Sequence, residues 1–336
     1  MKWRERSFRS TVASPAIVLI ASVALGAAAF GGPQAPGGPA STEARPMAAP
    51  AAGVTAVPVA AQVAAPLPAQ AEPEVPSLPG GGRKIFGRHR FLVAYYGTAG
   101  TGLLGVLGER DPDTTHQRLK QAARPFRRDG ERIQPVYELI VTVADAGPGT
   151  DGDYNHDIAH SLVQGYIDAA ERNGALLVLD IQPGRSDFLT VARRWEWALQ
   201  HPWVGLALDP EWRMGPHQVP AQVVGSVTAA EVNRVSAWLE YLVVDRALPQ
   251  KVFMLHQFRT SMLGQPDRIK DRAHLAEVQH VDGFGTPSQK RATYAAVARP
   301  KQFTMGFKLF YDEDRPRMSA TEVRRLRPAV RFVSFQ

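Results

Sequence analysis

Four carboxylic acids follow short apolar runs of this 336-residue sequence and could act as catalytic acids or bases: Glu211, Asp209, Asp180 and Asp282. Hydrolysis by acid/base catalysis uses two such groups, one to protonate the leaving oxygen and one to attack or to activate water. We predict that Glu211 is the acid and Asp209 its partner, with Asp180 or Asp282 as the alternative. Two strand residues span ~6.6 Å, between the spacings of retaining and inverting pairs, so the stereochemistry stays open.

The alternation of apolar and polar residues places these groups on one face of their strands. Successive side chains of a strand point to opposite faces, so Asp180 shares a face with Val178. The same rule assigns further ionisable residues to the inward faces of their strands, namely Asp209, Glu211, His256, Asp282 and Lys308. Burying them together costs desolvation energy, which is tolerated when the groups pair or act on a ligand. A salt-bridge network that only closes the fold is the alternative.

Polar and aromatic residues near the same strand ends indicate a carbohydrate ligand, because aromatic faces can stack on sugar rings. The predicted substrate-binding residues are Tyr95, Tyr96, Gln182, Trp212, His256 and Lys308. Ordinary packing is the alternative for any single aromatic residue. We expect neither a metal nor a cofactor.

Short β-rich runs that alternate with helical patterns must position these side chains. Eight runs predict strands, at Phe91–Gly97, Pro135–Val143, Ala175–Gln182, Val204–Glu211, Lys251–Phe258, Ala276–Gly283, Gln302–Tyr311 and Ala329–Phe335. Patterns between them predict helices, at Asp113–Arg127, His156–Arg172, Ser186–Leu199, Thr228–Arg246, Pro287–Arg299 and Ser319–Leu326. A fifth connection, around Ile269, is short.

Repeated strand–helix units indicate a parallel sheet, and eight of them predict an α/β fold of the (β/α)8 TIM-barrel type. The last strand lies at the end of the sequence, so the eighth outer helix is missing, and residues just before Phe91 are candidates to cover that gap. An open doubly wound sheet is the alternative. In a barrel, chemistry sits at the carboxyl ends of the strands, where the candidate residues fall.

The first part of the chain predicts export rather than a folded domain. Residues 1–30 place basic residues before an uncharged run, Thr11–Phe30, as in a signal peptide or signal anchor. Residues 31–85 are rich in Pro, Ala and Gly and indicate a disordered linker. The barrel domain is predicted over 86–336. We therefore expect an extracytoplasmic protein, secreted or tethered to the membrane only through the N-terminal segment; both are compatible with the sequence.

Charge and cysteine content exclude several classes of function. The chain has a net charge of +7, but nine basic and four acidic residues lie among the first 90, which leaves +2 for the rest. The predicted domain has no basic stripe, so nucleic acid is not an expected partner. The absence of Cys excludes disulfides, thiolate metal sites and a Cys nucleophile. The oligomeric state is undetermined.

Three short motifs imitate known sites. Gly100–Gly105 matches a dinucleotide pattern without the helix and acidic residue that such a site requires, and we interpret it as a Gly-rich loop over the barrel mouth. His156 and His160 have the spacing of a zinc helix, but no third ligand is evident. Asp151–Asp157 has the alternate-residue spacing of a calcium loop without its Gly and Glu; a solvated loop is the preferred interpretation.

The segments LDIQPGRSDF, LALDPEW, LHQF, DGFG and GFKLFYD, spread over Phe91–Gln336, resemble an exported, glycoside-hydrolase-like TIM-barrel family of bacteria without a defined activity. This resemblance implies a barrel with acidic residues at its strand ends. Many barrel glycosidases carry one Glu on strand four and another on strand seven. Glu211 matches the first in kind, but strand seven ends in Lys308, which puts the usual retaining mechanism in doubt.

These observations predict an exported hydrolase of an extracellular or cell-wall polysaccharide that uses carboxylate acid/base catalysis. A non-catalytic barrel that binds glycan or cell wall is the alternative, motivated by the missing strand-seven carboxylate. A structural envelope protein, in which the charges only lock the barrel, is a third interpretation. The sequence names neither the sugar nor the linkage.

Overall fold

The structure, a computed structural model, describes residues 76–87 and 89–336. The predicted signal segment, residues 1–30, and most of the predicted linker lie outside the described residues. Within the described part of the chain, none of the helices is long and apolar enough to cross a lipid bilayer.

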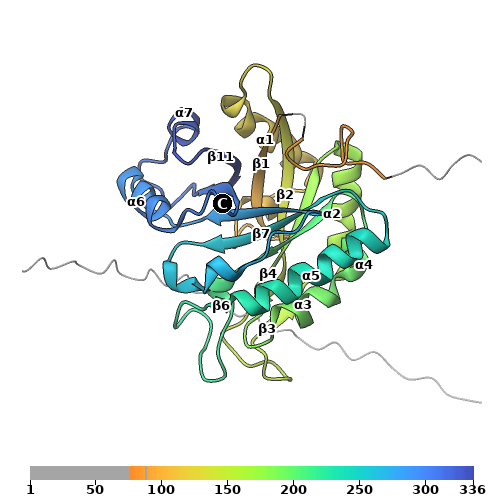
Figure 1. The fold of residues 1–336 in the computed structure, drawn as a ribbon, viewed down its shortest axis with the longest axis vertical. Helices are drawn as coiled ribbons and strands as arrows, with labels where there is room; N and C mark the ends of the chain where they lie inside the picture. The colour runs from red at the N-terminus through yellow and green to blue at the C-terminus, as the bar shows by residue number, and fades with distance from the viewer. Residues whose placement is uncertain (1–75, 88) are drawn as a thin grey trace, which may run out of the picture. The chain divides into compact units, whose positions relative to one another are not determined.

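Eight parallel strands close into a barrel, as predicted (Figure 1). In order around the barrel the strands are β1 (Arg90–Thr98), β2 (Arg132–Ala144), β4 (Leu176–Ile181), β5 (Val204–Leu208), β7 (Lys251–Gln257), β9 (Leu275–Val281), β10 (Thr304–Leu309) and β11 (Val330–Phe335). The barrel is closed because β1 pairs with both β2 and β11. The open-sheet alternative is therefore wrong, and each strand falls within or overlaps the run that predicted it.

The helices lie around the outside of the barrel (Figure 1). They are α1 (Pro112–Ala123), α2 (His160–Asn173), α3 (Phe188–Arg194), α4 (Glu196–Leu199), α5 (Ala229–Asp245), α6 (Pro287–Val297) and α7 (Ala320–Arg324). Between β7 and β9 the chain forms only short turns and the two-residue strand β8 (Leu263–Gly264), which pairs with β6 (Val227–Thr228). A further short strand, β3 (Asn155–Asp157), pairs antiparallel with the end of β2.

Local sequence signals account for the helix starts. Ser319 and Glu322 form a reciprocal capping box at the start of α7, in which each side chain accepts a backbone N–H of the other residue. The side chain of Thr228 caps α5 by accepting the backbone N–H of Glu231. The side chain of Glu231 does not complete a capping box there. It accepts hydrogen bonds from the backbone of Phe188 and from Arg213 instead, and so ties α5 to the start of α3.

Strand residues alternate between two apolar cores. In β4, Leu177 and Leu179 point outward into the large core beneath the helices, while Leu176 and Val178 point into the barrel. This is the alternation that the sequence predicts. The inner core is small and occupies the amino-terminal half of the barrel, which leaves the carboxyl-terminal half for polar side chains.

A segment before the first strand closes the amino end of the barrel. Leu78 and Ile85 are each 2% exposed and pack with the apolar side chains of the barrel interior. Arg83 anchors the segment through hydrogen bonds to backbone carbonyls just before β7. The sequence placed these residues in the linker and offered the chain before Phe91 as a cover for a missing outer helix. In the structure, residues 76–86 form a plug at the bottom of the barrel.

Candidate functional site

Seven of the eight barrel strands, and the residue directly after the remaining strand β5, each contribute a polar side chain to the carboxyl-terminal half of the barrel interior. We call this set the polar ring; it consists of Tyr96, Glu138, Asp180, Asp209, His256, His280, Lys308 and Ser334, none of which is more than 3% exposed. The strand registers place His256 beside His280 and Lys308 beside Ser334. Since an isolated buried charge is costly, these groups must compensate one another or a ligand.

His256 lies at the centre of the ring between two carboxylates. Its Nδ1 lies 2.9 Å from Oδ2 of Asp282, and its Nε2 lies 3.0 Å from Oε1 of Glu138. Burial and the nearby Lys308 favour the neutral ring, but the charge of Asp180 and the contacts with Asp282 and Glu138 outweigh them and hold the pKa of His256 well above its usual value. The two flanking carboxylates thus favour the protonated ring more strongly than burial and Lys308 oppose it.

Asp180 and Lys308 are joined through Tyr96. The hydroxyl of Tyr96 donates a 2.8 Å hydrogen bond to Oδ2 of Asp180, and the ammonium of Lys308 lies 3.5 Å from the centre of the tyrosine ring. Burial raises the pKa of Asp180 to about 6, opposed by the positive charge of His256. Lys308 Nζ also lies 3.8 Å from Asp282. The pairing of Lys308 with Asp282 that the sequence offered as a structural alternative is thus present.

The carboxyl groups at the mouth differ in acidity. Burial and the negative charge of Asp282 raise the pKa of Glu211 to about 7. Burial also raises the pKa of Asp282, but its hydrogen bond with His256 and the charges of His256 and Lys308 prevail and lower that pKa below its usual value. One group is therefore suited to give a proton and the other to accept one.

Asp209, the partner that the sequence gave first for Glu211, is 3% exposed. Burial together with the charges of Asp180 and Glu211 raises its pKa well above the usual value, despite the nearby His256. The pKa of Asp282, the alternative partner, is shifted in the opposite direction.

The structure brings together most of the predicted residues but not all of them. Tyr95 points outward into the core beneath the helices, where its ring packs on Tyr311 and Phe335, because consecutive strand residues face opposite sides. The side-chain carbonyl of Gln182 accepts the backbone N–H of Ala144 at 3.0 Å and braces the end of β2. Trp212 lies partly buried in the 3-10 turn Pro210–Trp212, which also carries Glu211.

Glu138 is the principal residue that sequence reasoning missed. It lies in the middle of β2 rather than at its end, flanked by Tyr137 and Leu139. Since β2 is 13 residues long, its middle lies beside Tyr96 of β1 and level with the polar ends of shorter strands. The sequence contained one indication: Glu138 is a charged residue inside an apolar run, two positions after Val136, and therefore shares the inward face of the strand with it.

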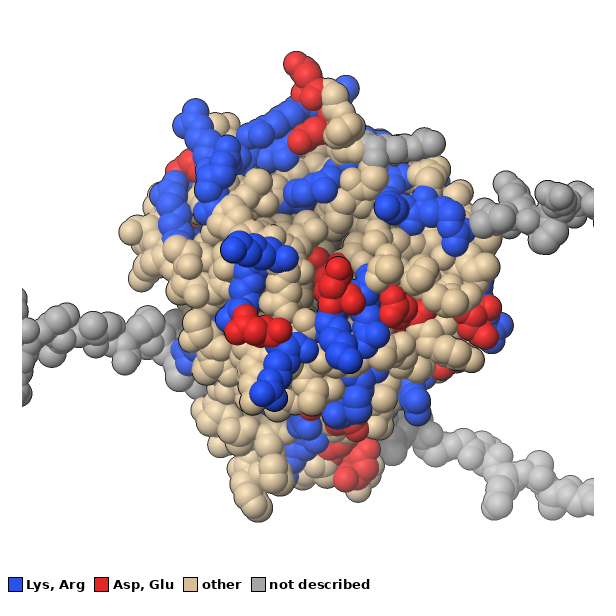
Figure 2. Space-filling view, viewed as in Figure 1, with Lys and Arg blue, Asp and Glu red and all other residues tan. Residues whose placement is uncertain are grey.

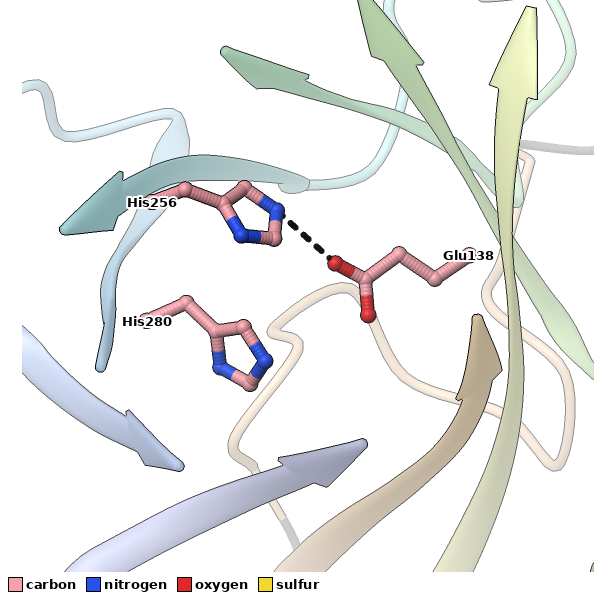
Figure 3. A group of neighbouring side chains, drawn as sticks. All are labelled: Glu138, His256 and His280. Carbon is pink, nitrogen blue, oxygen red and sulfur yellow. Dashed lines mark ion pairs between the residues drawn. The ribbon is translucent and has the colours of Figure 1, made fainter. Parts of the chain in front are cut away.

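Glu138, His256 and His280 are also arranged so that they could hold a metal ion. The three side chains converge inside the barrel, with both imidazole rings facing the carboxylate (Figure 3). One ligand atom from each lies within 4.8 Å of the other two. All three residues are fully buried.

A buried ion pair supports the loops at the mouth. Lys290 of α6 lies 3.0 Å from Oδ2 of Asp314 and donates hydrogen bonds to the carbonyls of Gly283 and Lys308. Asp314 in turn accepts the backbone N–H groups of Gly285 and Phe310. The pair thus ties the segment after β9, which begins with Asp282, to the end of β10, which carries Lys308, and to the loop after it.

The glycine-rich and calcium-like motifs serve structural purposes. Gly105 has a φ of 136°, and a Cβ there would lie 2.4 Å from the carbonyl oxygen of Tyr96, so glycine permits a close approach of two backbones. Within the Asp151–Asp157 segment, Asp153 and Asp157 pair with Arg194. An arginine therefore supplies the positive charge in that loop.

A separate depression lies at the opposite end of the barrel. It has a volume of about 460 Å³ and is lined by residues at the starts of β9 and β10, with Lys84 and Glu277 among them. Glu277 is 6% exposed, and neither carboxyl oxygen has a hydrogen-bond partner within the described part of the chain. The depression lies away from the polar ring, which remains the candidate site because its charged groups converge.

No model of a protein family matches the chain, and no curated protein is significantly similar to it. The candidate site is therefore interpreted from its geometry.

Proposed function

We propose that this chain is an exported hydrolase that cleaves an extracellular or cell-wall polysaccharide by acid/base catalysis, with Glu211 as the acid and Asp282 as the base or nucleophile. The observation that carries the proposal is the convergence of charged side chains from separate strands at the carboxyl end of a closed barrel. Active sites of such barrels lie at that end. The opposed pKa shifts of Glu211 and Asp282 support these two roles.

Features around the mouth support a carbohydrate substrate. Phe284, two residues after Asp282, is 52% exposed and makes a T-shaped contact with Phe310. The exposed part of its ring could stack on a sugar. Acidic side chains lie among the basic ones on the face shown in Figure 2. Mixed charge suits a neutral glycan better than a nucleic acid.

The test is a measurement of reducing ends released from purified envelope polysaccharides. Glu211→Gln should lower turnover by about 100-fold or more, the usual contribution of a positioned acid, with an unchanged melting temperature. Glu171→Gln, an exposed acid on α2, is the matched control and should retain full turnover. Full turnover in the Glu211 variant would remove this residue from the mechanism.

A non-catalytic glycan-binding barrel is the second candidate. It is favoured by β10, the seventh barrel strand, which carries Lys308 next to its last residue, where many barrel glycosidases carry a carboxylate. Retention of the wild-type chain on insoluble wall glycan, without any release of reducing ends, would support this candidate over hydrolysis.

Export is part of the proposal. Removal of residues 1–30 should leave the protein in the cytoplasm, whereas the full chain should reach the medium or the outer side of the membrane. Immunoblots of cell fractions measure this, and a cytoplasmic full-length chain would contradict it.

A further inference from the structure

We propose that Glu138, His256 and His280 form a binding site for one divalent transition-metal ion, of the zinc class, in the centre of the barrel. The inference stands apart from the proposed hydrolysis, because metal binding and sugar release are measured separately. A chain that binds zinc but releases no sugar keeps this inference and loses the proposed function.

The geometry of the three ligand atoms is close to that of a metal site. A zinc ion holds nitrogen and oxygen ligands at about 2.0–2.2 Å, so atoms that share it lie roughly 3–4 Å apart. Here Glu138 Oε1 and His256 Nε2 lie 3.0 Å apart, and the ligand atoms of all three residues lie within 4.8 Å of one another. A small closure of the side chains is enough to bring them around one ion (Figure 3).

The buried carboxylate of Glu138 lacks the hydrogen bonds that its burial demands. Neither of its oxygens, nor Nε2 of His256, has a hydrogen-bond partner within the described residues; the 3.0 Å contact between them is not aligned as a hydrogen bond. Buried polar atoms without partners are costly and therefore rare. A shared cation would satisfy these atoms together, whereas a proton on His256 leaves Glu138 Oε2 without a partner.

Neighbouring groups hold His256 as a ligand requires. Asp282 lies 2.9 Å from Nδ1 of His256. It can accept the hydrogen of that nitrogen and so leave the lone pair of Nε2 directed at Glu138. Metal-binding histidines nearly always have such a carboxylate or carbonyl partner.

His280 is held beside it by Ser334 and Gly306. The hydroxyl of Ser334 lies 2.7 Å from Nε2 of His280, and since a serine hydroxyl rotates freely, it can release this nitrogen to a cation. A Cβ at Gly306 would lie 2.4 Å from Nδ1 of His280, so glycine makes room for the imidazole ring.

The donor types of the three side chains select the kind of ion. Two imidazoles and one carboxylate suit zinc and other transition ions, whereas calcium and magnesium prefer oxygen ligands alone.

Calorimetric titration of the full chain with Zn²⁺, after chelator treatment, tests the proposal. We expect one equivalent to bind, with no binding of Ca²⁺ or Mg²⁺ at the same site. Glu138→Gln should abolish binding, and Asp282→Asn and Gly306→Ala should weaken it by about 10-fold or more, the effect of losing an outer partner of a ligand.

The matched control is the double variant His156→Gln/His160→Gln, which removes the zinc-like spacing on the surface and should bind Zn²⁺ as the wild type does. X-ray absorption of the zinc-loaded wild type, which needs no variant, should show two imidazole ligands. Absence of stoichiometric binding, binding that survives Glu138→Gln, or loss of binding in the control variant would each overturn the proposal.

Discussion

At the residue scale, burial is the largest influence on the acidity of the carboxyl groups in this barrel. It raises the pKa of Asp180, Asp209 and Glu211, because a charged group loses its hydration inside the protein. Asp282 is the exception: the neighbouring His256 and Lys308 lower its pKa despite its burial. One carboxyl group of lowered pKa beside others of raised pKa is an arrangement suited to acid/base work.

The first prediction concerns the pH dependence of turnover. If Glu211 is the acid, it must carry its proton, so kcat/KM should fall as the pH rises above about 7. The lowered pKa of Asp282 keeps it ionised at mildly acidic pH, so activity should persist there. The measurement is sugar release against pH, and a rate that stays level far above neutrality would contradict the role of Glu211.

The second prediction concerns stability and Glu277. Burial raises its pKa to about 8 in the folded chain, above the ordinary value of 4.5, so the folded state binds more protons between these values. The free energy of unfolding should therefore fall as the pH rises from about 5 to about 8, by up to roughly 1.4 kcal/mol per pH unit. Urea titrations should show a flatter dependence for Glu277→Gln, and equal slopes would refute the assignment.

At the element scale, the site depends on strands of different lengths ending around one mouth. The long strand β2 supplies Glu138 from its middle, while β9 is followed at once by Asp282. Lys290 of α6 connects the segments after β9 and β10 through its ion pair with Asp314 and its hydrogen bonds to the carbonyls of Gly283 and Lys308. These contacts fix the backbone next to Asp282 and Lys308.

The third prediction concerns this brace. Lys290→Met leaves Asp314 buried without its cation, and breaking a buried pair in this way typically costs about 3–5 kcal/mol. Chemical denaturation should show that loss. The double variant Lys290→Met/Asp314→Asn also removes the unpaired carboxylate of Asp314 and should recover part of the lost free energy of unfolding. If the double variant is no more stable than Lys290→Met alone, the ion pair is not the cause of the loss.

At the scale of the whole molecule, the barrel is closed at its bottom and polar at its top. Residues 76–86 seal the amino end with Leu78 and Ile85, and the polar ring occupies the other half. Water and ligands therefore have their approach to the ring at the carboxyl end. The plug lies mostly within the stretch that the sequence assigned to the linker, residues 31–85.

The fourth prediction concerns the plug. Ile85 is 2% exposed in the inner core, and Ile85→Ala should lower the free energy of unfolding by about 2–4 kcal/mol through lost burial and the cavity left behind. Ser77→Ala, at an exposed neighbouring position, should have no measurable effect. Equal stability of the two variants would show that the segment does not seal the barrel.

The sequence by itself determined the eight strands and their inward faces, because alternation within a strand is a local property. It thereby found Asp180, His256 and Lys308 correctly, and the same rule, applied to the pair Tyr95 and Tyr96, would have separated the outward residue from the inward one. Periodicity likewise found the helices and the short connection between β7 and β9.

Only the tertiary structure decided which residues meet. Barrel closure and strand register join segments far apart in the chain, and these set the level of Glu138 beside Tyr96 and opposite the two histidines. They also decide burial, and burial decides which carboxyl group is protonated. For that reason the opposed pKa shifts of Asp209 and Asp282, and the convergence of Glu138, His256 and His280, could not be read from local patterns.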